Sequence, residues 1–368
     1  MEILKVLLIV FYVLLVICNY NSYRNNKASN LLTIITVVFA TAMLFSTNTA
    51  DLDWEVTELD MSGYRTIYEK YAAIEYPEFN MYYAFYGCMH IGQMLGLNFR
   101  TWWAIMSIMA MAVAFIACRI HKYNFNLFLA TFMAYYEMVF YSGFKFFYGM
   151  CFLLLAYGYL LRNTKKDKIL YALFVCLAGG FHTLYYFFLI FLIKSNKHPK
   201  YFIGIVVAFT VLFTVLMRIS GAAAAMIAPF FNALGNDHVN IYTNRIVNMG
   251  FYMAVFLQLT FVYIASKIKK YKEYVDEYNS IVESFYYSVL LSIVFCPFYA
   301  VALTFMRFLT TFSLVAITAS SSLLSETNES RTTCLKMSLL MVAAYWCVQL
   351  FGFGNFIRLS VIPFFDVL

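Results

Sequence analysis

Five ionisable side chains lie within or beside long apolar runs, where an unpaired charge is expensive. They are Glu137 in the run 125–141, Lys145 in the short turn after it, His182 in a Gly-Gly-Phe-His break of the run 169–193, Arg245 before the run 249–266, and Arg307 near the start of the run 302–324. Ionisable groups at such places are functional candidates by default. Fixed cations would stabilise a leaving group that becomes negative, and a histidine, with an unperturbed pKa of about 6.5, could accept a proton.

Each of these residues also has a purely structural explanation. Glu137 and Lys145 could simply pair with each other. His182 could hydrogen-bond a carbonyl freed at the glycine break. Arg307 could reach the phosphates of bulk lipid, as long basic side chains do, and Arg245 could be an ordinary loop cation.

Acidic side chains concentrate in the stretch 49–80, which has eight acids against Arg65 and Lys70. Its Asp51-Leu-Asp53 pair could hold a divalent metal or act as a base, or the acids could form no more than a soluble loop face. The eight cysteines include no CxxC pair, so neither a zinc site nor a disulfide framework is supported. We therefore expect no zinc site and no cofactor.

The elements that position these residues are membrane helices. The chain of 368 residues is 63% hydrophobic and 12% charged, with a mean hydropathy of +0.73, whereas a soluble domain has about 45–50% apolar and about 25% charged residues. The apolar runs are long enough to cross a bilayer as helices. The net charge of +7 does not indicate nucleic acid, because membrane proteins gather lysine and arginine in their cytoplasmic loops. We expect one all-α polytopic transmembrane domain over 1–368, in contact with the lipid bilayer.

Charge distribution assigns the two sides of the membrane. Basic stretches that follow the runs ending near 19, 118, 161, 193, 266 and 324 should face the cytoplasm, and the acidic stretch 49–80 should face outside. The first run lacks a small-residue cleavage site, and its positive charges follow it, so we expect a retained helix with its N-terminus outside. The largest outer loops are then 49–100 and 218–248.

Parity of the crossings makes two further demands. The segment 81–97 should not span, and we expect an interfacial or re-entrant helix on the outer face. The run 169–193 must return to the side where it began, so we expect a broken helical hairpin with His182 at its tip, since irregular backbone at membrane depth is tolerated only inside protein or beside a wet cavity. Ten full crossings and this hairpin place the chain among proteins with about 10–12 transmembrane helices.

A family pattern links several of these residues. It begins as Asp60-Met-Ser-Gly-Tyr64-Arg-Thr-Ile-Tyr68 and continues as Glu78-Phe79 with Tyr82 and Tyr83. It then reads Phe144-Lys145-Phe146, Ala178-Gly-Gly-Phe181-His182-Thr183 and Met306-Arg307-Phe308. In this order the chain resembles the EpsG-type, Wzy-like polymerases of bacterial exopolysaccharide, capsule and O-antigen synthesis, over about residues 50 to 320. The family typically has Arg-Gln where Lys145-Phe146 stands, so the guanidinium fork is lost there while the positive charge is kept.

The resemblance implies a fold like that of the C-type membrane glycosyltransferases and a metal-independent glycosyltransferase in the cytoplasmic membrane, with its site facing outside. Donor and acceptor would both be oligosaccharide repeat units on undecaprenyl diphosphate. A chain-length regulator and a flippase are possible partners. The expected catalytic residues are His182, Arg307, Lys145, Glu78 and Asp60. The expected substrate-binding residues are Arg245, Tyr64, Tyr68, Tyr82, Tyr83 and Glu137.

Three rival functions stay open from the sequence. A glycosyltransferase that uses a polyprenyl-phosphate monosaccharide would place its base or metal at Asp51 and Asp53. A flippase for lipid-linked oligosaccharides would more often show internal repeats, and none is apparent. A membrane acyltransferase would need an intramembrane histidine and arginine on an early helix, and the first two apolar runs have neither.

Overall fold

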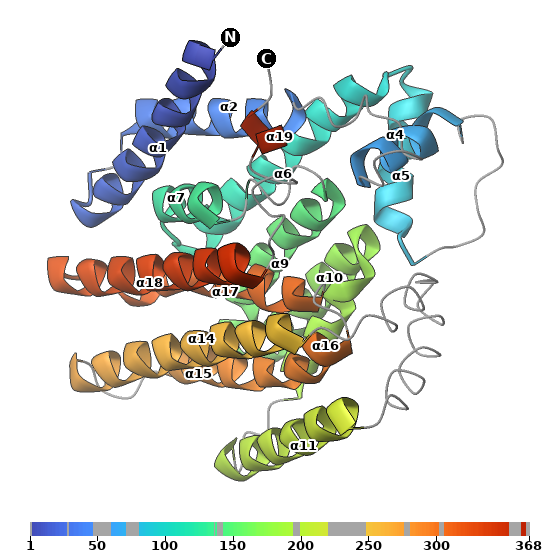
Figure 1. Ribbon diagram of the computed structural model, residues 1–368. Coiled ribbons are helices and arrows are strands. Elements are labelled where there is room, and N and C mark those ends of the chain that lie inside the picture. Colours follow the sequence, from blue (N-terminus) through green and yellow to red (C-terminus); the bar gives the residue numbers. More distant parts are fainter. Residues whose placement is uncertain are drawn as a thin grey trace.

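In the computed structural model, every element of the part of the chain that is described is helical (Figure 1). The structure describes residues 2–27, 29–46, 60–70, 81–135, 137, 143–193, 199–219, 248–275, 280–301, 305–352 and 362–365. The helices of the first half are α1 (Glu2–Arg24), α2 (Asn30–Ser46), α4 (Asp60–Lys70), α5 (Tyr83–Met94), α6 (Phe99–His121), α7 (Phe125–Tyr135), α9 (Phe144–Arg162), α10 (Lys165–Phe181) and η3 (Thr183–Leu192). Those of the second half are α11 (Pro199–Ile219), α14 (Asn248–Val275), α15 (Ser280–Leu291), η4 (Ser292–Phe295), α16 (Cys296–Val301), α17 (Met306–Leu323), α18 (Asn328–Gly352) and α19 (Ile362–Phe365).

Six helical segments within the described residues are long and apolar enough to cross a membrane. They are Ile3–Arg24, Phe99–His121, Phe144–Arg162, Phe251–Lys272, Ser280–Tyr299 and Asn328–Leu350. Four shorter apolar helices accompany them: Asn30–Leu44, Phe125–Tyr135, Thr183–Leu192 and Gly204–Val215. The chain is therefore a multi-pass, all-α membrane protein, as predicted, while the expected ten crossings stay a prediction.

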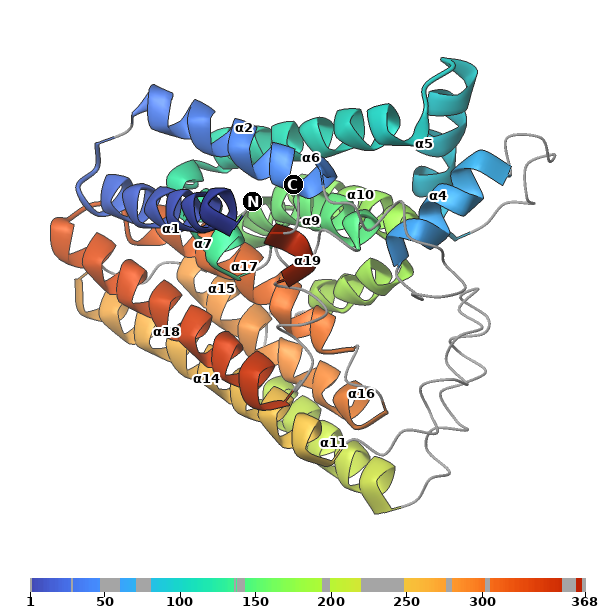
Figure 2. The same ribbon diagram turned by 45° about the horizontal axis from the view of Figure 1, so that its top comes forward.

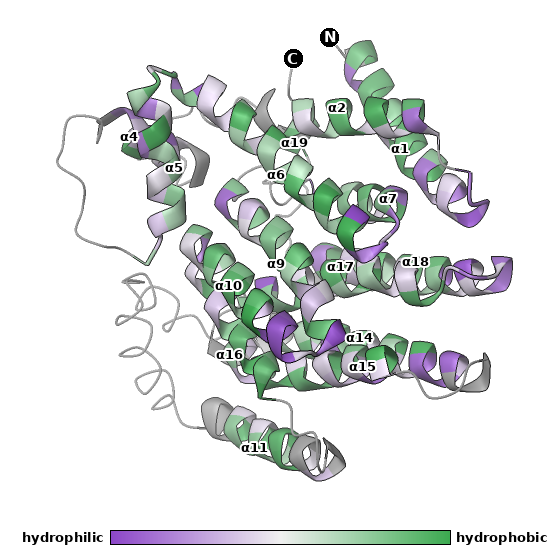
Figure 3. Cartoon of the chain, turned by 180° about the vertical axis from the view of Figure 1, so that it is seen from behind, coloured by the Kyte–Doolittle hydropathy of each residue, from purple (hydrophilic) through white to green (hydrophobic). Residues whose placement is uncertain are grey.

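Hydrophilic residues gather at one end of the bundle, called here the basic end (Figure 3). Arg331, near the start of α18, donates from Nε to the carbonyl of Arg24, the last residue of α1, and from Nη1 to the carbonyl of Ser325, at 3.3 and 2.7 Å. Lys272, near the end of α14, lies 3.6 Å from Glu326 in the turn before α18. These contacts bring together basic stretches that the charge pattern assigned to one side of the membrane.

Helix α9 is the most enclosed of the long helices, because it packs against α6, α10, α15 and α17. It runs from Phe144 to Arg162 at the basic end, so its first turn lies at the opposite end, called here the far end. The first turn of α17 lies at the far end too, since α17 ends beside the turn that leads to α18. Both helices thus begin where chemistry was predicted.

The hairpin predicted in the run 169–193 is confirmed. Helix α10 ends at Phe181, the chain reverses at His182, and η3 packs back against α10. The Tyr171 hydroxyl donates to the Phe188 carbonyl at 2.6 Å and ties the middle of α10 to the middle of η3. Two details differ from the expectation: both glycines of the break are helical, and the second half is a 3-10 helix, whose ten residues rise about 20 Å.

The segment 81–97 forms a short helix, α5, that is absent from the candidate spans. Figures 1 and 2 show α5 lying across the direction of the long helices, beside α4, at the side of the bundle where α6 begins. This arrangement fits the expected interfacial helix. Helices α4 and α5 belong to the predicted outer loop, and they place it at the far end, next to the tip of the hairpin.

Candidate functional site

Three of the predicted residues meet at the far end of the bundle. Lys145 comes from the first turn of α9, His182 from the tip of the α10–η3 hairpin, and Arg307 from the first turn of α17. Together they are called here the far-end cluster. The Phe146 ring lies near two of them: its centroid is 4.7 Å from that of the His182 ring and 5.9 Å from the Arg307 guanidinium carbon. The charges of Lys145 and Arg307 both act on His182.

His182 is held by the local backbone. Its Nδ1 accepts the Leu184 backbone N–H at 3.3 Å, which caps the first turn of η3. Its ring packs edge-on against Phe146 and Tyr82, the latter with centroids 6.1 Å apart. The side chain is 8% exposed, and its Nε2 makes no hydrogen bond within the described part of the chain. The imidazole is thus fixed in place with its second nitrogen turned to no described residue.

Lys145 lies among aromatic rings of the outer-loop helices. Its ammonium nitrogen is 4.8 Å from the Tyr64 ring centroid and 4.7 Å from that of Tyr82. The Phe85 ring follows at 5.9 Å. Cation–π contacts of this kind attract the ammonium to the ring faces, so Lys145 joins the start of α9 to both α4 and α5. The alternative pairing with Glu137 does not occur, since neither carboxylate oxygen of Glu137 has a hydrogen-bond partner.

Arg307 is half-buried, and its guanidinium donates no hydrogen bond to a described residue. Neither Arg307 nor His182 is within ion-pair distance of a carboxylate in the described ranges. A cation in such surroundings without a counter-ion is costly to maintain. The arrangement is therefore suited to binding an anion from outside the protein, and a guanidinium can clasp phosphate oxygens with two hydrogen bonds.

The four predicted tyrosines divide into two groups. Tyr64 and Tyr82 lie at the far-end cluster, and the Tyr82 hydroxyl accepts the Thr183 hydroxyl at 3.4 Å. Tyr68 is 4% exposed and instead packs on Trp102, while its hydroxyl donates to the Leu97 carbonyl at 2.9 Å. This position gives Tyr68 a role in holding α4 to the start of α6 rather than in facing a substrate.

Tyr83 serves to dock α5 on α10. Its hydroxyl donates to the Cys176 carbonyl at 2.8 Å, and its ring covers Gly180. A Cβ added at Gly180 would lie 2.7 Å from the Tyr83 ring and 2.9 Å from the Ala84 Cβ, closer than any ordinary contact. The glycine next to the hairpin tip therefore permits the approach of α5 that brings Tyr82 to Lys145 and His182.

Glu137 lies at the far end but outside this cluster. It is fully buried, and the Tyr12 hydroxyl of α1, which interacts with its carboxyl group, donates to the Met133 carbonyl at 2.6 Å. Nothing places Glu137 against Lys145, His182 or Arg307, so its predicted substrate contact has no support in the geometry.

Of the remaining acidic and basic candidates, only Asp60 lies in a described helix. Asp60 is the first residue of α4, one helical turn before Tyr64. Asp51, Asp53, Glu78 and Arg245 lie outside the described residues. Within the residues that the structure describes, no group of three or more histidine, cysteine and acidic side chains is placed to hold a metal ion.

The sequence reasoning missed the part played by Phe146 and Phe85. The Phe146 ring lies beside both His182 and Arg307, and the Tyr185 hydroxyl donates to the Phe146 carbonyl at 2.6 Å. A signal was available, because Phe146 stands where the resembled family has glutamine. Phe85 had no such signal, since its contact with Lys145 depends on how α5 crosses the bundle.

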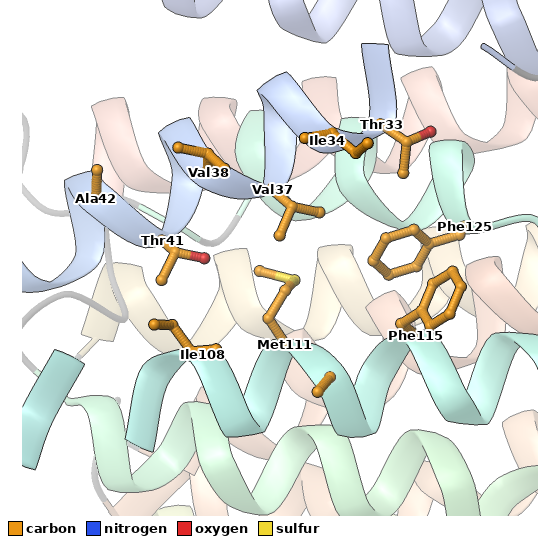
Figure 4. Close-up of a pocket in the computed structure, with 11 residues that line it drawn as sticks. Thr33, Ile34, Val37, Val38, Thr41, Ala42, Ile108, Met111, Phe115 and Phe125 are labelled. Carbon is orange, nitrogen blue, oxygen red and sulfur yellow. The ribbon is translucent and has the colours of Figure 1, made fainter. Parts of the chain in front are cut away.

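An apolar groove of about 570 Å³ lies elsewhere, between α2 and α6 (Figure 4). Its lining residues are Thr33, Ile34, Val37, Val38, Thr41, Ala42, Ile108, Met111, Ala112, Phe115 and Phe125. Ile34, Val38 and Ile108 are more than half exposed, so the groove opens sideways toward lipid. It has no charged side chain and contains no member of the far-end cluster, so it suits a hydrocarbon chain and not a sugar or a phosphate.

The comparisons with known proteins agree with the motifs. No curated protein and no solved structure matches the chain. The sequence model of the EpsG family matches residues 44–364, a range that holds α4, α5, α9, the hairpin and α17 and so includes the whole far-end cluster. Because this match covers most of its length, the chain belongs to the EpsG family.

Proposed function

We propose that the protein is a polysaccharide polymerase that joins oligosaccharide repeat units carried on undecaprenyl diphosphate, by glycosyl transfer on the outer face of the cytoplasmic membrane. Membership of the EpsG family supports a polysaccharide polymerase-type function in general terms. The observation that carries the finer proposal is the far-end cluster, where Arg307 and His182 meet with no carboxylate partner in the described residues.

The reaction needs negative charge on a leaving diphosphate to be stabilised. An oxygen of the acceptor sugar attacks the anomeric carbon, and the bond from that carbon to the diphosphate oxygen breaks. The electron pair leaves with the diphosphate, where fixed cations lower the energy of the transition state. Arg307 is assigned this role first and Lys145 second, with Arg245 as a further candidate.

The acceptor hydroxyl must also lose its proton to a base. The sequence offers His182, Asp60, Glu78 and Glu137 for this role, and the charges of Lys145 and Arg307 act on His182. The ring of Tyr82, which is partly exposed beside Lys145, would pack against the sugars, and the buried ring of Tyr64 supports Lys145 from below the site. As implied by the family resemblance, the reaction is proposed to be metal-independent, so chelation by EDTA in isolated membranes should leave polymer formation unchanged.

The orientation of the site follows from the charges. The basic end holds Arg24, Arg331 and Lys272, and cytoplasmic loops of membrane proteins are enriched in such residues. The far end then faces outside, where lipid-linked repeat units delivered by a flippase would arrive. A chain-length regulator is proposed as a second partner at the same face.

Deletion of the gene tests this function. We expect single repeat units to accumulate on lipid while long polymer disappears from the cell surface. Restoring the gene with Arg307→Ala or His182→Ala should leave protein levels intact and yield no polymer, whereas Arg119→Ala at the basic end, the matched control, should restore it. Truncated repeat units lacking one sugar would instead identify a monosaccharide-adding transferase, and full-length polymer from either far-end variant would remove that residue from the reaction.

A further inference from the structure

The hairpin tip constrains the protonation of His182. The first backbone N–H groups of η3 have no partner within the helix, so one of them needs an acceptor outside it. His182 Nδ1 is that acceptor for Leu184 at 3.3 Å. The backbone of His182 is fixed as well: its N–H donates to the Ala178 carbonyl, and its carbonyl accepts the Tyr185 N–H, both at 3.0 Å. The ring is thus oriented by the turn itself.

A nitrogen that accepts a hydrogen bond must hold a lone pair and no proton. Neutral imidazole carries one proton, and with Nδ1 as the acceptor that proton lies on Nε2. Nε2 is also the nitrogen that makes no hydrogen bond to a described residue. His182 therefore presents a donor, not a lone pair, to whatever occupies the site, and an imidazole in this form has no free nitrogen with which to take a proton from a sugar hydroxyl.

We infer that His182 acts as a neutral Nε2–H hydrogen-bond donor to an anionic oxygen of the leaving diphosphate, and not as the general base. This inference rests on the proposed function. An uncharged donor beside Lys145 and Arg307 adds a third hydrogen bond to the diphosphate without adding a third positive charge next to the other two.

The proton of the acceptor hydroxyl must then go elsewhere. As the acceptor oxygen forms its bond to the anomeric carbon, its proton passes to a carboxylate, and the diphosphate leaves with the electron pair of the broken bond. The carboxylates that the sequence offers for this role are Asp60 and Glu78.

The first test reads the tautomer directly and does not depend on the reaction. The full chain, labelled with 15N-histidine and held in lipid nanodiscs at neutral pH, has five histidines, and His182→Gln identifies the signals of His182. Nitrogen chemical shifts distinguish a protonated from an unprotonated ring nitrogen. We expect a protonated Nε2 and an unprotonated Nδ1. A proton on Nδ1 with a bare Nε2, or protons on both, would overturn the inference whether or not the protein is a polymerase.

The second test uses a matched pair of variants that are both unable to act as a base. The amide nitrogen of His182→Gln can reach the position of Nε2, whereas His182→Asn can only replace Nδ1 and cap η3. If the ring is a donor, His182→Asn should lose about 100- to 1,000-fold in polymer formation, as after loss of one donor to a developing oxyanion. His182→Gln should retain at least ten times more activity than His182→Asn. Equal loss in the two variants, at equal protein levels, would return the role of base to His182.

Discussion

The approach of α5 to the hairpin tip gives a sharp test of how the site is built. Gly180→Ala adds one methyl group beside His182, at a place where the new Cβ would lie 2.9 Å from the Ala84 Cβ and 2.7 Å from the Tyr83 ring. The Ala84 Cβ is fixed to the backbone of α5 and cannot turn aside. To reach the 3.4 Å at which ordinary contact begins, α5 must retreat by about 0.5 Å.

The fold should tolerate this change. Overpacking costs about 1–3 kcal/mol, and replacing glycine by alanine in a helix returns about 1 kcal/mol. The Tyr83 hydroxyl would strain against its 2.8 Å bond to the Cys176 carbonyl, worth about 0.5–1.5 kcal/mol. The net loss is therefore about 1–3 kcal/mol, local to the contact between α5 and α10.

The reaction should tolerate it less well. Tyr82 precedes α5 directly, and its ring lies 4.7 Å from the Lys145 ammonium, so a retreat of α5 displaces it from the cluster. A misplacement of 1 Å can cost about 100-fold in rate, so a shift of 0.5 Å predicts about a tenfold loss. The assay is the amount and length distribution of surface polymer in cells restored with the variant, at matched protein levels.

Two further variants show whether the close contact at Gly180, and not the replacement of a glycine as such, causes the loss. Gly87→Ala lies on α5 itself, where an added Cβ meets nothing within 4 Å, and it should leave polymer unchanged. Ala84→Gly combined with Gly180→Ala removes the fixed contact and should recover part of the loss. Wild-type polymer from Gly180→Ala alone would refute the reasoning, because the close approach of α5 would then not matter to the site.

Four other substitutions test individual contacts. Arg307→Lys keeps the charge but loses the guanidinium fork, so polymer formation should fall at least about tenfold; equal activity would show that a point charge is enough. Lys145→Met removes a cation from two ring faces, so the thermal midpoint of the detergent-solubilised protein should fall by an amount equal to about 1–2 kcal/mol, and an unchanged midpoint would contradict the contact. Glu137→Gln should leave both polymer and midpoint intact, and a tenfold drop in polymer would place Glu137 back in the reaction. Tyr68→Phe loses the bond to Leu97, costing about 1 kcal/mol of stability with no change in polymer length.

The sequence was sufficient to predict that Lys145, His182 and Arg307 lie at the same end of the bundle. Parity of the charged loops required a reversal within 169–193, and the reversal occurs at His182. The same parity placed the starts of the helices that carry Lys145 and Arg307 at one end of the bundle. There Lys145 lies over the Tyr82 ring and Arg307 over the Phe146 ring, and both rings pack against His182. These predictions succeeded because the cost of burying charge in lipid acts on whole segments, and the order of segments can be read from a sequence.

Contacts between side chains could not be predicted in this way. The tyrosine pair Tyr64 and Tyr68 is spaced by four, which puts both on one face of a helix, yet one faces Lys145 and the other packs on Trp102. The difference arises because α4 lies over the junction of α5, α6 and α9, so its first turns meet different neighbours. Glu137 and Lys145 are likewise near in sequence but are carried on separate helices that face different partners.

The glycine break is a second place where side-chain contacts could not be predicted, and the structure shows the role of its residues. The sequence predicts that Gly179 and Gly180 interrupt the helix and place irregular backbone beside a wet cavity. In the structure both are helical, and the reversal is made by His182, whose extended backbone and ring cap η3. Gly180 instead provides room for Tyr83 and Ala84 of α5.

The motif Ala-x2-Phe-His thus combines two functions within five residues. It has a glycine that allows the outer helix α5 to approach, and a histidine whose ring is oriented by the turn in which it lies. A substitution at either position should therefore impair the site without unfolding the bundle, and the two should differ in one respect. Loss of the glycine displaces Tyr82, whereas loss of the histidine removes a hydrogen-bond donor beside Arg307.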